Sequence, residues 1–268
     1  MRPGIAGTLK SFVVKTFLLY LLPLLWSEPA AIEKNEAPLQ VTKSFFRLGD
    51  QVFTLEKLQS PAERNFSVVS LHNDEEGFIE NARRFVAEEG GALYVLQNGG
   101  RKDISVELLD HQVAFDPNEI FTLYGRKVFK PRKGIYFKID QYVAQFARFI
   151  VNELGQEKHI IDIHGHLAGE KDITDYKKEL KKFKDIRGVH HNPAKNPHTY
   201  FLTSDEGLYG QLREEGFNCV LQSNYKLRGD GSLNEYCRRI NRLYVRVVTV
   251  QGDDAAQEEM LRALSRIF

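Results

Sequence analysis

The sequence predicts an α/β fold, a three-layer α/β/α sandwich around a mixed, mostly parallel central sheet. Apolar runs of strand length alternate with segments of helical period along the chain. These runs are nearly continuous in Val, Ile and Leu, as in strands buried on both faces, so helices should cover both sides of the sheet. The composition, 42% hydrophobic and 27% charged, is that of a globular protein and excludes a disordered or coiled-coil chain.

The N-terminal residues differ in composition from the rest of the chain. Three basic residues precede an apolar run at residues 16–26, and Ser-Glu-Pro-Ala-Ala follows it, a pattern typical of an export signal. At about 1.5 Å per residue this run is too short for a hydrocarbon core of ~30 Å, so a membrane anchor would need residues 12–26 together. We predict that residues 1–31 are a signal peptide or an N-terminal anchor. The protein would then be exported, periplasmic or extracellular, or held at the inner membrane.

The rest of the chain divides into a short linker and one domain. Residues 32–43 are polar and contain proline, which predicts a linker. Residues 44–268 show no second change in composition, no repeat and no flexible hinge, so we expect a single domain there. Strands are expected at residues 67–71, 92–96, 159–163, 218–222 and 243–250, and helices at 74–89, 141–154, 204–215 and 232–241. The basic run at residues 177–185 is expected to be a solvated helix face, with a partner-binding patch as the less favoured alternative.

Charge and cysteine content exclude several classes of function. Lys+Arg at 37 against Asp+Glu at 36 provides no overall field that would attract nucleic acid or an anionic membrane. Two cysteines form neither a disulfide scaffold nor a four-thiolate metal cluster. Cys219 and Cys237 could form one disulfide in an exported domain, or remain two separate buried thiols. Function must therefore come from a local site.

Metal-ligating side chains follow two of the expected strands. His72 and Glu75 come directly after residues 67–71, three positions apart, which lets an imidazole and a carboxylate converge. His164 ends another buried strand, at the sheet edge where open α/β sheets place their ligands. Two histidines and one glutamate leave a fourth position for water, the ligand count of a catalytic zinc site.

The same residues also have a purely structural interpretation. His72 and Glu75 could form an ion pair at a helix start, and His164 could be a hydrogen-bonded residue at a strand end. Four further histidines compete as ligands or are loop residues: His166, His190, His191 and His198.

Several motifs in a fixed order carry a resemblance to a known family. They lie at residues 66–75 (FSVVSLHNDE), 98–101 (NGGR) and 115–122 (FDPNEIFT), and continue at 190–194, 200–203, 216–222 and 230–233. Together they resemble the zinc carboxypeptidase superfamily, in a bacterial branch near the succinylglutamate desuccinylase/aspartoacylase-like hydrolases. The resemblance covers roughly residues 65–265 and implies a zinc carboxypeptidase-like fold for the domain.

The resemblance also implies roles for individual residues. His72, Glu75 and His164 would hold Zn²⁺, with water completing the site. Arg101 would be catalytic, because its guanidinium would stabilise the oxyanion that develops on the scissile carbonyl. Asn118 would bind the carboxylate end of the substrate. On the residues alone, Arg101 could instead form a surface ion pair and Asn118 could be a turn residue.

Two positions depart from the family pattern. Glu119 stands where the family has an arginine that pairs with a substrate carboxylate, which puts recognition of a free C-terminus in doubt. Val248 stands where the family has the glutamate that acts as general base. Such a base contributes ~10²–10⁴-fold, so residual hydrolysis could survive on the metal alone. Asp74, Glu76 or Glu119 could replace the missing carboxylate.

These observations lead to competing functional hypotheses. The first is an exported zinc-dependent amide or peptide hydrolase of carboxypeptidase type, weakened by Val248, with a peptide or N-acyl amino acid as substrate and a cell-wall peptide as one candidate. The alternative is a non-catalytic, zinc-containing protein that binds a peptide or peptidoglycan fragment. A third is a scaffold without metal. None of these involves nucleic acid, and membrane contact would be limited to residues 12–26.

Overall fold

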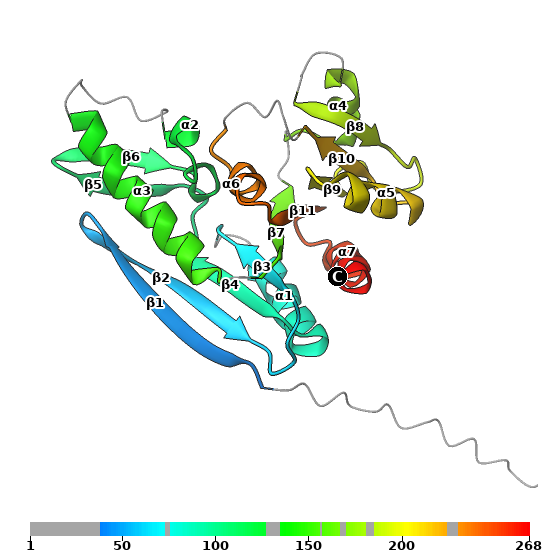
Figure 1. Cartoon of the computed structure of the whole chain (residues 1–268), viewed down its shortest axis with the longest axis horizontal. Helices are drawn as coiled ribbons and strands as arrows, with labels where there is room; N and C mark the ends of the chain where they lie inside the picture. The colour runs from blue at the N-terminus through cyan, green and yellow to red at the C-terminus, as the bar shows by residue number, and fades with distance from the viewer. Residues whose placement is uncertain are drawn as a thin grey trace, which may run out of the picture. The chain divides into compact units, whose positions relative to one another are not determined.

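The computed structural model describes most of the chain after the N-terminal segment (Figure 1). The described residues are 38–72, 76–126, 135–155, 157–166, 170–180, 185–223 and 230–268. The predicted signal peptide or anchor, residues 1–31, lies outside them. No helix in the described ranges is long and apolar enough to cross a membrane.

One nine-stranded sheet forms the centre of the described residues, in the order β1-β2-β4-β3-β7-β11-β9-β10-β8. Its strands are β1 (Gln40–Leu48), β2 (Gln51–Gln59), β3 (Phe66–Ser70), β4 (Ala92–Gln97), β7 (His159–His166), β8 (Ile186–His190), β9 (Tyr200–Thr203), β10 (Cys219–Gln222) and β11 (Leu243–Val250). The middle strands β4, β3, β7 and β11 are parallel neighbours. Strands β1 and β8 also run in their direction, while β2, β9 and β10 oppose them. The sheet is therefore mixed, with most described strands pointing one way.

Helices cover both faces of this sheet and complete a three-layer sandwich. On one face α1 (Glu76–Glu89), α5 (Glu206–Glu214) and α7 (Asp254–Ile267) bury an apolar core. On the other face, α3 (Ile135–Glu153), α4 (Ile173–Glu179), α6 (Leu233–Arg239) and the small antiparallel sheet of β5 (Ile104–Leu108) and β6 (His111–Phe115) bury a second core. The predicted α/β/α class is confirmed.

Short connecting helices lie beside the carboxyl ends of the central strands. The 3₁₀ helix η1 (Pro117–Glu119) and α2 (Leu123–Arg126) follow β6. Asp116 caps η1 by accepting a hydrogen bond from the backbone N–H of Asn118 at 2.7 Å. The backbone N–H of Phe121 donates to the carbonyl of Gly231 at 2.8 Å, which joins this segment to the loop before α6.

Local sequence signals set several helix ends. Gly90 follows α1 with φ of +97°, a left-handed conformation that ends a helix at low cost for glycine. Asp205 caps α5 through the backbone N–H of Leu208 at 2.7 Å, so this helix begins after Asp205 and not at Ser204. Helix α3 begins at Ile135, six residues before the predicted start, because its buried stripe extends back to Ile139.

The predicted linker differs from the structure at its C-terminal end. Strand β1 begins at Gln40, inside the range 32–43, and pairs antiparallel with β2 from Gln40 opposite Gln59. It is an edge strand whose first residues are exposed, so its sequence is as polar as that of a linker. The basic run predicted as a helix face is helical only as far as Glu179, and residues 181–184 lie outside the described part.

The two cysteines are separate buried thiols. Cys219 belongs to the core beneath α1, α5 and α7, whereas Cys237, on α6, belongs to the core on the opposite face. The sheet therefore lies between them, which rules out the disulfide alternative. Burial raises the pKa of both thiols, that of Cys237 to about 12.

Candidate functional site

A cavity of about 380 Å³ lies at the carboxyl ends of the central strands. It is lined by His72, two residues after the end of β3, by His164 of β7 and by Val248 of β11, together with residues of η1 and of the loop before α6. This is the sheet edge at which the sequence predicted a site, and it is where open α/β sheets bind their ligands.

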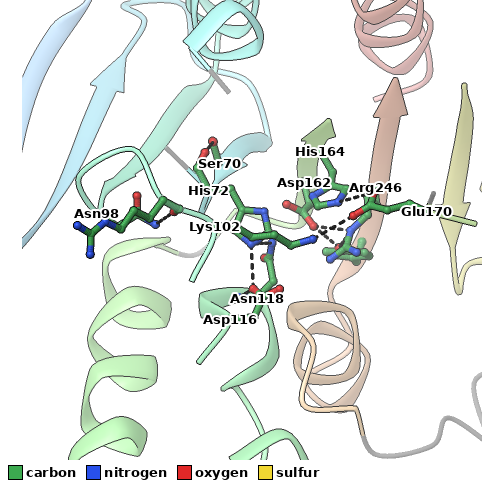
Figure 2. Close-up of polar contacts among 12 residues, drawn as sticks. Ser70, His72, Asn98, Lys102, Asp116, Asn118, Asp162, His164, Glu170 and Arg246 are labelled. Carbon is green, nitrogen blue, oxygen red and sulfur yellow. Dashed lines mark hydrogen bonds and ion pairs between the residues drawn. The ribbon is translucent and has the colours of Figure 1, made fainter. Parts of the chain in front are cut away.

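His72 and His164 come together in this cavity (Figure 2). His72 lies just after β3 and His164 lies within β7. The two strands are parallel neighbours, and the ring centroids of the two histidines are 5.2 Å apart. The side chain of His72 is only 2% exposed. Two imidazoles at this separation are close enough to approach one cation from two strands.

A carboxylate orients His72 from outside the pair. Asp116 Oδ1 lies 2.9 Å from His72 Nε2, and Asn118 Nδ2 lies 3.3 Å from the same nitrogen. Burial opposes the charge of Asp116, but His72 and the backbone N–H of Asn118 lower the pKa of its carboxyl. With Nε2–H donating to Asp116, Nε2 does not accept a hydrogen bond from Asn118, and the lone pair of the ring is placed on Nδ1.

His164 is held as a neutral imidazole. Burial, followed by the positive charge of Arg246 and the proximity of His72, lowers its pKa well below the usual value. Glu170 Oε2 lies 3.8 Å from His164 Nε2, and Glu170 Oε1 accepts a hydrogen bond from Lys102 Nζ at 3.0 Å. The neutral form is the one that donates a lone pair to a metal.

Strand β11 contributes a cation and an apolar side chain to the cavity. In the pairing of β11 with β7, Val248 lies opposite His164 and Arg246 lies opposite Asp162. Arg246 Nε donates to Asp162 Oδ2 at 2.8 Å and to the hydroxyl of Tyr244 at 3.1 Å. Burial opposes the charge of Arg246, but Tyr244 and Asp162 raise its pKa, so the guanidinium remains charged.

Acidic side chains form another part of the lining. Asp116, Glu119 and Asp230 all border the cavity. Burial, together with the negative charges of Asp116 and Asp230, raises the pKa of Glu119. Residue 119, at which the family named in the sequence resemblance has an arginine, is thus acidic in its surroundings as well as in its own side chain.

The structure brings together only part of the predicted site. His72, His164 and Asn118 line one cavity with Val248 beside them. Arg101 is exposed and is not among the described residues that line the cavity, although the next residue, Lys102, is. Its assignment as an oxyanion donor stays a prediction.

The remaining candidates lie outside the cavity or outside the described residues. Glu75 and Asp74 are not described, and neither is the side chain of Glu76. Among the described residues, no group of three or more His, Cys, Asp or Glu side chains is arranged to hold a metal ion. His166 and His198 contact each other, with 3.4 Å between Nε2 and Nδ1. None of the four competing histidines (His166, His190, His191 and His198) is among the described residues that line the cavity.

Among the charged side chains that line the cavity, Asp116, Lys102, Glu170 and Arg246 were not assigned a role from the sequence. A signal existed for two of them. Asp116 stands two residues before Asn118 in Asp-Pro-Asn, the pattern of a helix cap whose carboxylate points back into the loop. Arg246 is a lone charge inside the apolar run 243–250. For Lys102 and Glu170 the sequence contains no comparable signal.

Comparison with known proteins gives similarities of structure only. No model of a protein family matches this sequence, and no curated protein matches it either. Similar solved structures include a metallo-carboxypeptidase from Burkholderia cenocepacia, with 12% identity and a TM-score of 0.44 over 84% of this chain and 64% of that chain. A succinylglutamate desuccinylase/aspartoacylase from Rhodobacter sphaeroides has 11% identity and a TM-score of 0.43 over 89% of this chain and 68% of that one.

A third similar structure, an aspartoacylase family protein from Mesorhizobium loti, has 10% identity and a TM-score of 0.39 over 86% of this chain and 68% of that chain. These are the groups of proteins that the sequence motifs resemble. The chain spans less than two thirds of the length of the Burkholderia carboxypeptidase. Identities and TM-scores of this size define neither the ligand nor the reaction of this chain.

Proposed function

We propose that this chain is a zinc-dependent hydrolase of amide or peptide bonds, of carboxypeptidase type, in which Val248 weakens catalysis. The observation that carries the proposal is the convergence of His72 and His164 on one cavity, with Asp116 hydrogen-bonded to Nε2 of His72. Metal-bound histidines usually donate their outer ring N–H to such a carboxylate, which fixes the tautomer and the direction of the lone pair.

The chemistry of the donor set fits zinc. His72 and His164 would hold it through their imidazole rings, and the third protein ligand would be Glu75, which lies outside the described residues. Bound zinc supplies a Lewis acid that polarises a carbonyl and lowers the pKa of a coordinated water. Ligand binding would then use Asn118, whose buried Oδ1 has no hydrogen-bond partner among the described residues.

Proton transfer is the step that this chain would perform poorly. Val248 lies opposite His164 and lines the cavity, but an isopropyl group cannot accept a proton. Of the three carboxylates that could replace the missing base, Glu119 is the one whose side chain the structure describes. It lines the cavity and has a raised pKa. A carboxyl with a raised pKa is better suited to proton exchange near neutral pH than an ordinary one.

The substrate and the location are part of the same proposal. A peptide or N-acyl amino acid is the expected substrate class, and a cell-wall peptide is the candidate that export would favour. Export to the periplasm or the outside, with or without anchoring through residues 12–26, rests on the composition of residues 1–31.

Val248 also supports an alternative function. If no carboxylate replaces the missing base, the chain would be a zinc-containing protein that binds a peptide or peptidoglycan fragment without cleaving it. The two histidines and Asn118 would serve such a protein equally well.

Metal analysis tests the site itself. We expect stoichiometric zinc in the purified full chain by inductively coupled plasma mass spectrometry, and close to none in His72→Ala or His164→Ala. His111→Ala is the matched control, because His111 lies on β6 and is not among the described residues that line the cavity. Unchanged zinc in both cavity variants would exclude the ligand assignment.

Activity separates the hydrolase from the binding protein. A panel of N-acyl amino acids and cell-wall peptides, with and without chelator, should reveal slow, chelator-sensitive hydrolysis. Val248→Glu should raise that rate by roughly 10²–10⁴-fold, whereas Val248→Gln, of similar size but unable to act as a base, should not. Binding of the panel with no turnover in any variant would support the alternative.

A further inference from the structure

Arg246 is a charged residue of the cavity to which the proposed hydrolysis assigns no role. It lies on β11 between Tyr244 and Val248, and its side chain lines the cavity with 23% exposure. Figure 2 shows its ion pair with Asp162. Alternate residues of a strand face the same side and are about 6.6 Å apart. Arg246 is therefore about 6.6 Å along β11 from Val248, which lies opposite His164. A small amino acid derivative is long enough to reach from one position to the other.

Its hydrogen bonds to the described residues use only one of its three nitrogens. Both hydrogen bonds that Arg246 makes to described residues leave from Nε, one to Asp162 Oδ2 at 2.8 Å and one to the hydroxyl of Tyr244 at 3.1 Å. A guanidinium carries five N–H donors in a planar fork. The terminal nitrogens thus retain donor capacity for a ligand in the cavity.

The ion pair between Asp162 and Arg246 is better explained by a role in ligand binding than by a contribution to the stability of the fold. Asp162 has no exposed side-chain surface, and within the described residues its Oδ1 has no hydrogen-bond partner. Buried ion pairs are often no more stable than apolar side chains of the same volume, and the other face of β7 and β11 has such side chains. Asp162 and Tyr244 instead fix the guanidinium in one position, which lowers the entropic cost of binding a planar anion.

The acidic part of the lining leaves few positions for an anionic ligand. Asp116, Glu119 and Asp230 would repel a carboxylate, and Glu119 occupies the position of the arginine expected from the family resemblance. Two lysines also line the cavity. Lys102 donates to Glu170 at 3.0 Å, and Lys171 Nζ lies 5.9 Å from the centroid of the Tyr176 ring. Among the described cations that line the cavity, Arg246 is the one that has a planar guanidinium with N–H donors left for a ligand.

We propose that Arg246 is the specificity-determining residue of the cavity and that it binds a carboxylate of the ligand through its terminal nitrogens. The inference rests on the proposed function only in that the cavity is a ligand site. A carboxylate is the acceptor that the guanidinium fork fits with two parallel hydrogen bonds. It could be a terminal carboxylate or an acidic side chain, and the two sources are separable by experiment.

Four small probes distinguish these sources by isothermal titration calorimetry on the full chain with its native metal content. N-acetyl-L-glutamate carries both carboxylates, N-acetyl-L-glutamine only the terminal one, N-acetyl-L-isoglutamine only the side-chain one, and N-acetyl-L-glutaminamide neither. We expect the last to bind at least tenfold more weakly than the tightest of the other three. The single-carboxylate probe that retains affinity identifies the source.

Variants then connect that difference to Arg246. Arg246→Met should remove the preference for the carboxylate probe, and Arg266→Met, an exposed arginine on α7 paired with Glu215, should keep it. Because Arg246→Met leaves Asp162 buried alone and could fail to fold, the double variant Asp162→Asn/Arg246→Met removes both charges. This double variant should unfold cooperatively on heating and should bind the carboxylate probes no more tightly than the probe without a carboxylate.

Several results would overturn the inference. Equal affinity of the wild type for all four probes, no binding of any carboxylate probe at millimolar concentration, or a preference that persists in a folded double variant would each do so. The outcome is independent of hydrolysis. A chain without zinc or turnover that still prefers carboxylates through Arg246 would refute the proposed function and support this inference.

Discussion

Strands β7 and β11 present different faces to the two helical layers. On one face, Ile161 and Val247 pack in the apolar core beneath α1 and α7. On the other, His164 and Arg246 line the cavity, and Asp162 is buried against Arg246. Both sets of side chains come from the same two paired strands. Neighbouring residues along each strand point to opposite faces, so the two sets alternate in the sequence.

The contrast shows what each face is selected for. Apolar side chains lower the free energy of the folded state by burial alone, at about 25 cal/mol per Å² removed from water. Charged and imidazole side chains in the same strands must each find a partner, because unpaired buried polar groups are costly. The face that bears this cost is the one that borders the cavity, so its residues are better explained by ligand binding than by stability.

The largest effect is expected from breaking the ion pair on the polar face. Arg246→Met should reduce the free energy of unfolding by about 3–5 kcal/mol, because it leaves Asp162 charged and buried without a partner. Urea unfolding measures this change. Asp162→Asn/Arg246→Met should recover much of the loss, whereas a double variant as unstable as the single one would contradict this explanation.

A smaller effect is expected in the metal affinity. Asp116→Asn keeps the size of the side chain but removes the charge that accepts from His72 Nε2. Loss of such a partner typically reduces metal affinity by about 10–100-fold. Competition with a chromogenic zinc chelator would measure it. Asp110→Asn, in the turn between β5 and β6, is the matched control and should leave the affinity as it is.

The apolar face should respond in stability alone. Ile161→Val removes one methylene from a side chain with no exposed surface, and should cost about 0.5–1.5 kcal/mol. Zinc content and probe binding should remain at the wild-type level, as measured by mass spectrometry and calorimetry. A loss of zinc in this variant would show that the two faces are not independent.

The smallest change is expected from the thiols, which lie one on each face. With a pKa of about 12, Cys237 would be thiolate to the order of 10⁻⁴ at pH 8, and burial limits access to both cysteines. Ellman's reagent should therefore label neither cysteine in the folded chain and both after denaturation. Labelling should accelerate as the pH rises. Absence of free thiols after denaturation would show that the cysteines are bonded.

The sequence predicts the parts of this arrangement that depend on local pattern. Strand β11 has the predicted bounds. His72 and His164 meet because they lie just after β3 and near the end of β7, two parallel strands that point to the same sheet edge. Strand β1 was not predicted, because an exposed edge strand is polar.

Contacts that depend on how the strands pair could not be predicted from the sequence. Asp162 and Arg246 are 84 residues apart, and only the pairing of β7 with β11 places them side by side. The same holds for Asp116, which reaches His72 across 44 residues through the position of η1. The direction of Arg101 depends on the loop after β4, in which two glycines with positive φ allow several paths.

The sheet order also has a kinetic consequence. The cavity is formed by β3, β7 and β11, which are widely separated in the chain yet adjacent in the sheet. Contacts of such long sequence separation form slowly, because loops must close before the contacts compensate for the lost entropy. The cavity cannot form before the residues near position 248 have been synthesised. A ligand can therefore assist only the last stages of folding, and the earlier intermediates must be stable without the ligand.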